Sequence, residues 1–217
     1  MKISDHFRNI KEGGYYRYVY TIAEIGVNHN GSLDEAMRLI DAASEAGVDA
    51  VKFQKRDLDS IYTKEILEDP NRAEWNIDYL IPILKEVELS ENDYKAIKKK
   101  CDDLNIELII TPFDNNSAIF CKKLGVDAFK VASADMINFD LLNLLGSFGL
   151  PIIVSTGMWG EPEIKKAANH FKKSMPFSNV CMLLANSTYP TPYESINLGY
   201  LKRLKEIHSI VGYSGHE

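Results

Sequence analysis

Three charged residues lie inside or at the end of runs that are otherwise apolar: Glu24, Lys52 and Lys130. Because an ionised group buried without a partner is strongly unfavourable, each of them needs a counter-charge or a ligand. One hypothesis is a network of internal salt bridges with a purely structural role. The other is that the two lysines form a pocket for an anion, while the carboxylate acts on the bound substrate.

Hydroxyl residues favour the second hypothesis, because five of them also lie at the ends of apolar runs. They are Thr111, Ser133, Ser155, Ser187 and Ser214. Hydroxyl donors together with ammonium groups match the hydrogen-bonding needs of a phosphate or a carboxylate. The sequence therefore predicts an anion-binding site built from the two lysines and these hydroxyls.

Two histidines could add further chemistry. His216 follows the seventh apolar run, where it is either an ordinary loop side chain or a metal ligand. A metal would take its remaining ligands from water, from substrate or from residues beyond Glu217. His29 follows the first run and either shapes the turn there or contacts substrate. The other three histidines are expected at the surface, and these are His6, His170 and His208.

The apolar runs that position these residues recur seven times, and their length is typical of parallel strands buried on both faces. They are residues 20–24, 50–54, 108–111, 128–133, 152–155, 181–187 and 210–216. Helical segments separate them, at residues 32–47, 90–104, 115–124, 140–145, 161–173 and 197–207. This alternation predicts an α/β fold, a TIM-type (β/α) barrel with its active site at the carboxyl ends of the strands. Seven of eight strands are present, so residues 1–217 are predicted to form one incomplete barrel domain.

One connection is much longer than the others. Residues 55–88 join the second apolar run to the second helical segment. Loops of that length in a compact domain usually act as lids or binding loops, which is the prediction for this segment.

Composition excludes several classes of partner. The chain has 217 residues and a net charge of −6, which argues against nucleic acid or an anionic membrane. No apolar run approaches the roughly 18 residues of a membrane span, and residues 1–20 lack the apolar core of a signal peptide. The 3 cysteines have no ligand-like spacing, so reduced thiols in a cytoplasmic protein are expected.

Seven blocks follow one another along the chain: AEIGVNHNG at 23–31, VKFQ at 51–54, TPF at 111–113, FKVAS at 129–133, STGM at 155–158, NSTYP at 186–190 and GYSGHE at 212–217. They resemble the sialic acid synthase family. That family includes the N-acetylneuraminate, legionaminate and pseudaminate synthases and a spore-coat polysaccharide branch.

The resemblance implies that phosphoenolpyruvate condenses with the open-chain aldehyde of an N-acetylated hexosamine. The products would be a nine-carbon 2-keto sugar acid and phosphate. Glu24 would be the general base or orienting carboxylate, and His216 one of two histidine ligands of a divalent Mn²⁺ or Mg²⁺ ion. With Lys52 these are the catalytic residues that the resemblance implies. Phosphoenolpyruvate would be held by Lys52, Thr111, Lys130, Ser133, Ser155, Ser187 and Ser214. The sugar would contact Gln54, Asn76 and Tyr189.

The resemblance also implies parts that the printed chain lacks. The family continues through an eighth strand, which carries the second metal histidine, and a small C-terminal antifreeze-like domain. The full-length form is expected to be a homodimer. The chain is therefore expected to belong to a longer protein, or to be a truncated product that is poorly stable alone.

Two other functions remain open from the sequence. Lys52 or Lys130 could form a Schiff base with pyruvate, as barrel lysines do in aldolases. Alternatively, the chain could be a truncated, non-catalytic relative that binds a sugar or an anion. Dependence on phosphoenolpyruvate would argue against the aldolase.

Overall fold

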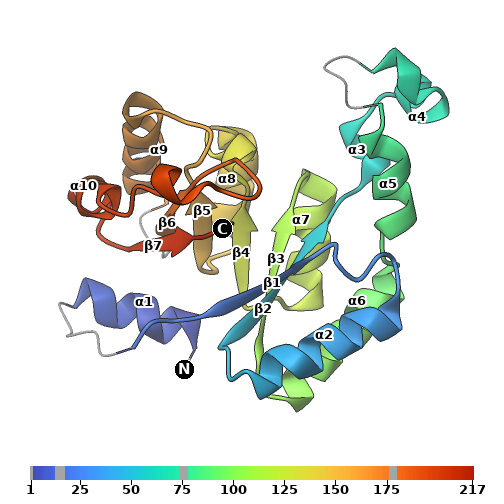
Figure 1. Ribbon diagram of the computed structural model, residues 1–217, viewed down its shortest axis with the longest axis horizontal. Helices are drawn as coiled ribbons and strands as arrows, with labels where there is room; N and C mark the ends of the chain where they lie inside the picture. The colour runs from blue at the N-terminus through green and yellow to red at the C-terminus, as the bar shows by residue number, and fades with distance from the viewer. Residues whose placement is uncertain (1, 13–17, 74–77, 176–179) are drawn as a thin grey trace. The chain divides into compact units, whose positions relative to one another are not determined.

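A computed structural model of the chain describes residues 2–12, 18–73, 78–175 and 180–217 (Figure 1). The chain divides into two compact units. One comprises residues 21–126, here called the 21–126 unit; the other comprises residues 127–217 with residues 1–20, here called the 127–217 unit. Each unit contains parallel strands and helices, and each is described by itself.

Three parallel strands form the centre of the 21–126 unit: β1 (Ile22–Gly26), β2 (Ala50–Lys55) and β3 (Glu107–Pro112). β2 pairs in parallel with both of the others. All residues of β3 and the first four of β2 are buried. This explains the nearly continuous apolar runs, since a strand covered on both faces has no side for solvated residues.

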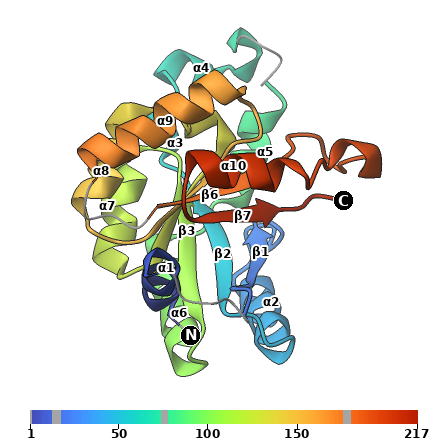
Figure 2. The ribbon, with the colours of Figure 1, turned by 90° about the vertical axis from the view of Figure 1, so that its left-hand side faces the viewer.

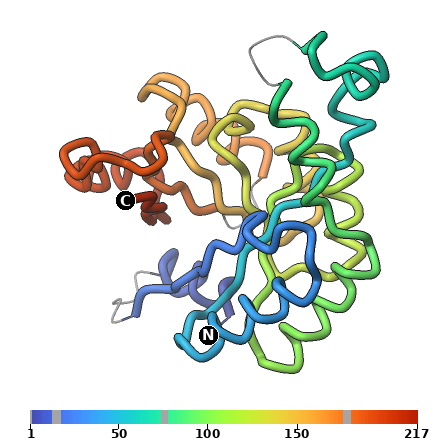
Figure 3. The backbone as a smooth tube through the Cα atoms, turned by 45° about the vertical axis from the view of Figure 1, so that its right-hand side comes forward, coloured from blue at the N-terminus to red at the C-terminus, as the bar shows by residue number. Residues whose placement is uncertain are grey.

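Three helices of this unit match predicted segments: α2 (Leu33–Glu45), α6 (Glu91–Asp103) and α7 (Asn115–Leu124). α2 and α6 lie side by side (Figures 1 and 3). Caps set where they begin: Ser32 accepts a hydrogen bond from the backbone of Glu35, and Ser90 with Asp93 forms a complete capping box. Gly125 ends α7 with φ +84°, a left-handed conformation that favours glycine.

The prediction of a long loop at 55–88 is wrong in part, because this connection contains short helices. They are α3 (Leu58–Ile61), α4 (Lys64–Glu68), the 3₁₀ helix η1 (Pro70–Arg72) and α5 (Leu80–Val87). α5 buries Ile81, Leu84 and Val87. Pro82 lies in its first turn, where a missing N–H breaks no helical hydrogen bond. Helices of 4 to 8 residues are too short for a helical period to be legible in the sequence.

Four parallel strands form the centre of the 127–217 unit, and each pairs with the next: β4 (Ala128–Val131), β5 (Ile152–Ser155), β6 (Val180–Ala185) and β7 (Val211–Ser214). Its helices in predicted segments are α8 (Phe139–Ser147), α9 (Glu161–Ser174) and α10 (Tyr200–Ile207). α10 packs against β6 and β7 (Figure 2).

Three of these strands end earlier than predicted: β4 at Val131, β6 at Ala185 and β7 at Ser214. The 3₁₀ helix η2 (Ser133–Asp135) follows β4, and η3 (Tyr193–Ser195) lies in the connection after β6. Ser133 and Ser187 therefore lie just beyond their strands rather than in them. Loops at the carboxyl ends of parallel strands are still the usual place for functional side chains.

Helix α1 (Ile3–Lys11) is an element that the sequence pattern does not predict. It buries Ile3 and Phe7, one helical turn apart, and Lys2 before it forms an ion pair of 3.5 Å with Asp127. His6 is 8% exposed, which contradicts its expected place at the surface. Two apolar positions are too few to make such a short helix legible.

The α/β class with parallel strands is confirmed, whereas closure into a barrel and an eighth strand remain predictions. Within the described residues, no helix is long and apolar enough to cross a membrane. The three cysteines are buried. Burial raises the pKa of the Cys121 and Cys181 thiols to about 12, so neither offers a reactive thiolate.

Candidate functional site

Lys52 contacts two other predicted site residues, Glu24 and Thr111. It is 7% exposed, and its Nζ lies 2.8 Å from Glu24 Oε2. The same Nζ donates a hydrogen bond of 2.9 Å to Thr111 Oγ1. β1, β2 and β3 run in parallel, so side chains near their carboxyl ends are brought to one edge of the unit.

The charge on Lys52 is balanced within this group. Burial lowers the pKa of its ammonium, and the adjacent Glu24 carboxylate opposes that shift. The Glu24 side chain is half exposed, so it can accept hydrogen bonds from water or a ligand as well as from Lys52. The salt bridge of the first hypothesis therefore exists, and it leaves the carboxylate accessible as the second hypothesis requires.

A bulge places the Glu24 carboxylate beside Gln54. The pairing of β1 with β2 shifts between Glu24 and Gly26, and Gly26 has φ +57°. A Cβ on Gly26 would lie 3.1 Å from Glu24 Oε1 and 3.4 Å from Gln54 Nε2. Because Gly26 has no side chain, the Glu24 carboxylate and the Gln54 amide, the predicted sugar contact, can both lie close to it.

His29 shapes the turn after β1, as one of the two hypotheses for it states. It is 1% exposed, and its Nδ1 accepts a hydrogen bond of 3.1 Å from the backbone N–H of Gly31. Its ring stacks on Phe53 with centroids 5.9 Å apart. Burial lowers the pKa of the imidazole, which favours its neutral form.

Arg56 is a residue that the sequence analysis missed. Its guanidinium lies 3.7 Å from the centre of the Phe113 ring. It lines a cavity of about 430 Å³ together with Lys55, Glu88 and Asn116. Its position directly after β2, a strand that carries Lys52 and Gln54, is the signal that could have identified it.

In the 127–217 unit, the strands place three more predicted residues. Lys130 in β4 is 8% exposed and donates a hydrogen bond of 3.0 Å to the Val131 carbonyl. Ser155 ends β5 and is buried, whereas Ser214 ends β7 and is half-buried. Ser155 and Ser214 are the last residues of their strands, and Lys130 is the next to last residue of β4.

Two more predicted hydroxyls lie against Gly157. Ser133 Oγ accepts a hydrogen bond of 3.0 Å from the Gly157 N–H. A Cβ on Gly157 would lie 2.8 Å from Ser187 Oγ and 3.1 Å from Ser133 Oγ. Because the Gly157 N–H uses one acceptor position of Ser133, the hydroxyl proton of Ser133 is available to an anion.

The residues beside Gly157 hold its loop. Thr156 donates from both its N–H and its Oγ1 to the Leu183 carbonyl, at 3.1 and 3.0 Å. Trp159 Nε1 donates to the Ser133 carbonyl at 2.6 Å. The loop after β5 is therefore tied to β6 on one side and to η2 on the other.

Tyr189 and His216, which the resemblance assigns to sugar and metal, lie together. Their ring centroids are 4.2 Å apart, and the Thr191 N–H donates a hydrogen bond of 2.9 Å to the His216 carbonyl. Tyr189 is 71% exposed. Asn76, the remaining predicted sugar contact, lies outside the described residues.

His216 provides one group that fits a metal. Its Nδ1 is buried and has no hydrogen-bond partner among the described residues. A buried imidazole nitrogen without a partner is suited to a metal ligand. Across the described ranges, no group of three or more His, Cys, Asp or Glu side chains is arranged to hold a metal. Further ligands would therefore be water, substrate or residues outside those ranges.

In both units, buried lysines and hydroxyls lie at or near the carboxyl ends of parallel strands. This arrangement defines the class of the protein: a parallel α/β protein with polar side chains near the ends of its strands. Such a set of donors favours an anionic ligand.

Comparison with known proteins identifies the family. The chain belongs to the NeuB family, whose model matches residues 39–217, and its relatives include the sialic acid, legionaminate and pseudaminate synthases. The resemblance found in the seven sequence blocks is thereby confirmed.

The relatives are similar over most of this chain. The N,N′-diacetyllegionaminic acid synthase of Legionella pneumophila is 36% identical over 215 residues, which cover 95% of this chain and 60% of the relative. Human N-acetylneuraminate-9-phosphate synthase is 33% identical, covering 91% of this chain and 55% of the relative. The crystal structure of an N-acetylneuraminic acid synthetase from Leptospira borgpetersenii, in complex with citrate, superposes with a TM-score of 0.79 at 32% identity. It covers 92% of this chain and 65% of that one. The chain thus spans little more than half the length of these curated relatives.

Proposed function

We propose that the protein to which this chain belongs condenses phosphoenolpyruvate with the open-chain aldehyde of an N-acetylated hexosamine. The product is a nine-carbon 2-keto sugar acid, and inorganic phosphate is released. The observation that carries the proposal is the buried Lys52, held between the Glu24 carboxylate and the Thr111 hydroxyl within a NeuB-family chain.

The ammonium and hydroxyl groups are assigned to the anionic oxygens of phosphoenolpyruvate. Lys52 and Lys130 supply positive charge from buried positions, where it interacts more strongly than in water. Donors already fixed by the fold need no reorganisation when charge develops on the substrate. The hydroxyl donors in this assignment are Thr111, Ser133, Ser155, Ser187 and Ser214.

Glu24 is assigned to the reaction at C2 of phosphoenolpyruvate. C3 of phosphoenolpyruvate bonds to the aldehyde carbon, and the aldehyde oxygen takes up a proton. The positive charge that develops at C2 is stabilised by the half-exposed Glu24 carboxylate. Water then adds to C2, Glu24 accepts its proton, and the tetrahedral intermediate breaks its C–O bond to release phosphate.

His216 is assigned to a divalent ion, Mn²⁺ or Mg²⁺, through its buried Nδ1. When bound, such an ion acts as a Lewis acid that polarises the aldehyde oxygen. The chain's own contribution is to position His216, through the Thr191 hydrogen bond to its backbone carbonyl and the Tyr189 ring beside its imidazole.

Gln54, Tyr189 and Asn76 are assigned to the sugar. Gln54 lies next to the Glu24 carboxylate, and the exposed Tyr189 ring offers an apolar face beside His216. We assign the catalytic form to a homodimer of the full-length protein.

The test is phosphate release, measured on the full-length protein with phosphoenolpyruvate and each sugar of a panel. The panel contains N-acetylmannosamine, its 6-phosphate and its 2,4-diacetamido trideoxy analogues, which differ at the positions that separate the named relatives' products. Release should require both substrates and stop with a chelator. Phosphoenolpyruvate binding without turnover of any sugar would instead support the non-catalytic anion-binding function.

A Schiff-base aldolase is the second candidate, favoured by the lowered pKa of Lys52. Borohydride should then trap a pyruvate adduct on Lys52 or Lys130. Turnover that depends on phosphoenolpyruvate, without such an adduct, would exclude this candidate.

A further inference from the structure

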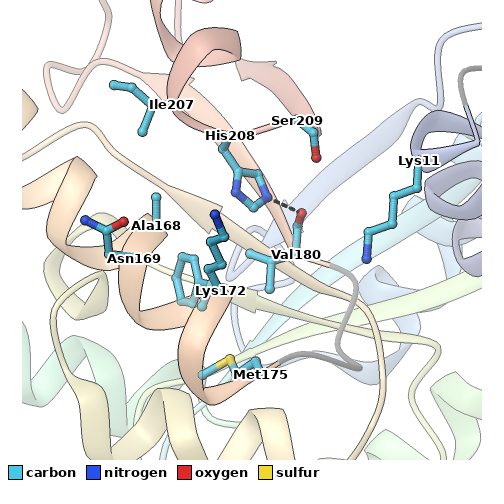
Figure 4. Close-up of a pocket in the computed structure, with 10 residues that line it drawn as sticks. Lys11, Ala168, Asn169, Lys172, Met175, Val180, Ile207, His208 and Ser209 are labelled. Carbon is cyan, nitrogen blue, oxygen red and sulfur yellow. Dashed lines mark hydrogen bonds between the residues drawn. The ribbon is translucent and has the colours of Figure 1, made fainter.

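A second cavity, of about 450 Å³, lies in the 127–217 unit (Figure 4). It is found at the amino ends of β6 and β7, where Val180 begins β6 and Ser209 precedes β7. Ser187 lies beyond the opposite end of β6, roughly 16 Å or more away at about 3.3 Å per residue. The cavity is therefore separate from the strand ends that carry the proposed catalytic residues, and its volume suits a small ligand.

The charged lining of this cavity is basic. Lys11 from the last turn of α1, Lys172 from the last turn of α9 and His208 after α10 contribute to it, and none of the ten lining residues is acidic. Cations are favourable near helix C-termini, which explains the position of each lysine on its own helix. It does not explain why two lysines and a histidine line one cavity in a chain with a net charge of −6.

His208 presents one defined nitrogen to a ligand. Its Nε2 lies 2.7 Å from the Val180 carbonyl, and because a carbonyl only accepts, Nε2 carries the proton. Nδ1 is then the nitrogen left for a ligand, and Figure 4 shows Lys172 and Lys11 on opposite sides of this ring. Burial lowers the pKa of His208, and the charge of Lys11 lowers it further. A bound anion would oppose the effect of Lys11 and favour a protonated Nδ1 that donates to it.

The remaining lining is mainly apolar. Phe171 and Met175 are buried at the C-terminal end of α9, and the Phe171 ring meets the His208 ring edge-on with centroids 6.5 Å apart. Val180 and Ile207 extend this surface, while Asn169 adds an amide. A ligand that matches both the basic and the apolar lining of the cavity has an anionic head and an apolar body.

We propose that this cavity binds a small organic phosphate. The phosphate lies beside the Lys172 ammonium and Nδ1 of His208, Lys11 adds positive charge from the other side of the ring, and the apolar body lies against Phe171 and Met175. An ammonium group and a protonated imidazole suit phosphate oxygens, since charge-assisted hydrogen bonds are about twice as strong as neutral ones. The site does not depend on the proposed function, because it shares no residue with the proposed active site.

Phenyl phosphate is the probe, titrated into the protein by isothermal calorimetry. Saturable binding at one site is expected, with weaker binding of inorganic phosphate, which lacks the apolar body. Lys172→Met should lower the affinity for phenyl phosphate by roughly tenfold, the scale of one hydrogen bond to a charged group. Lys173→Met is the matched control, because Lys173 is the next residue of the same helix and does not line the cavity.

A second readout locates the ligand. With ¹⁵N-labelled histidine, phenyl phosphate should shift the Nδ1 resonance of His208 in the wild type, and more ligand should be needed in Lys172→Met. Equal affinities in Lys172→Met and Lys173→Met would overturn the proposal, as would equal binding of inorganic and phenyl phosphate. An affinity lowered by Ser133→Ala but not by Lys172→Met would place the ligand in the proposed active site and would also overturn it.

Discussion

The Lys52 ammonium and the Glu24 carboxylate lie 2.8 Å apart at paired positions of neighbouring parallel strands. The lysine is buried, whereas the carboxylate is half exposed. The pair therefore keeps a positive charge in the interior and an accessible carboxylate in contact with it. An anion that binds Lys52 is placed next to a group able to accept a proton.

Lys52→Met tests this pair, because it keeps the side chain's length and removes its charge. Under the proposed function, phosphate release should fall by roughly 10²- to 10³-fold, the loss expected when one fixed donor to developing charge is removed. Glu24 can be solvated after the change, so circular dichroism should show a folded protein. Lys99→Met is the control, since it removes an exposed lysine that pairs with Asp103. Wild-type turnover in Lys52→Met would contradict the assignment.

Gly157→Ala should destabilise the loop that holds Ser133. The added Cβ would lie 2.8 Å from Ser187 Oγ, so the backbone or the serine must move. The free energy of unfolding should fall by about 1–3 kcal/mol, the usual cost of overpacking, as measured by urea denaturation. Gly199→Ala is the control, because the nearest atom to its Cβ would be 3.9 Å away.

Making Gly157→Ala in a Ser187→Ala background tests whether the clash with the Ser187 hydroxyl causes the destabilisation. Removing the Ser187 hydroxyl should reduce the cost of Gly157→Ala, giving a coupling energy in the double-mutant cycle. The same cost in both backgrounds would show that Ser187 is not the obstacle.

His29 should make the fold less stable in mild acid. Its pKa is lowered from 6.5 by burial, so as pH falls through 6.5 the unfolded chain takes up this proton before the folded chain does. The resulting loss of unfolding free energy is absent above pH 6.5 and grows until the pH is below the pKa of His29 in the folded chain. Urea denaturation should therefore show less stability at pH 5.5 than at pH 7.5. His29→Asn keeps an acceptor for the Gly31 N–H and should reduce the difference. If the pH dependence of stability were unchanged in His29→Asn, His29 would not be its source.

His216→Ala should weaken the binding of Mn²⁺, read from the electron paramagnetic resonance signal of the free ion. A decrease of roughly tenfold or more is expected, since even the loss of an outer-shell partner has effects on that scale. His170→Ala is the control, because His170 lies on α9 and bonds to Asn143, whereas His216 follows β7. Equal Mn²⁺ affinities in the two variants would remove His216 from the metal site.

Strands buried on both faces were the most predictable part of the fold. All residues of β3 are buried, and the predicted run at 108–111 lies inside it. β1 lies two residues later than predicted, because the bulge at Glu24–Gly26 extends the strand past the charged residue. Helices α1 and α3 to α5 were missed because each is too short to show a helical period. α1 and α5 bury a few side chains, whereas α3 and α4 bury none.

The site was predictable where a strand end decides the position of a side chain. Lys52 and Thr111 meet because the long lysine side chain reaches from the middle of β2 to Thr111, near the carboxyl end of the paired strand β3. Arg56 was missed because its position depends on stacking against Phe113, across a connection whose conformation the sequence does not reveal. Trp159 was missed for a similar reason, since its hydrogen bond to Ser133 depends on the path of a loop.

The two hydrogen bonds from Thr156 to the Leu183 carbonyl have a consequence for engineering substrate scope. They lock the end of β5 onto β6 through atoms that no proposed substrate contact uses. The segment after β6, which carries Ser187 and Tyr189, can therefore be randomised while Ser155 keeps its place. A combinatorial library at residues 186 and 188–190, with Ser187 and Thr156 kept, would then sample new sugar specificities on an unchanged anchor for phosphoenolpyruvate.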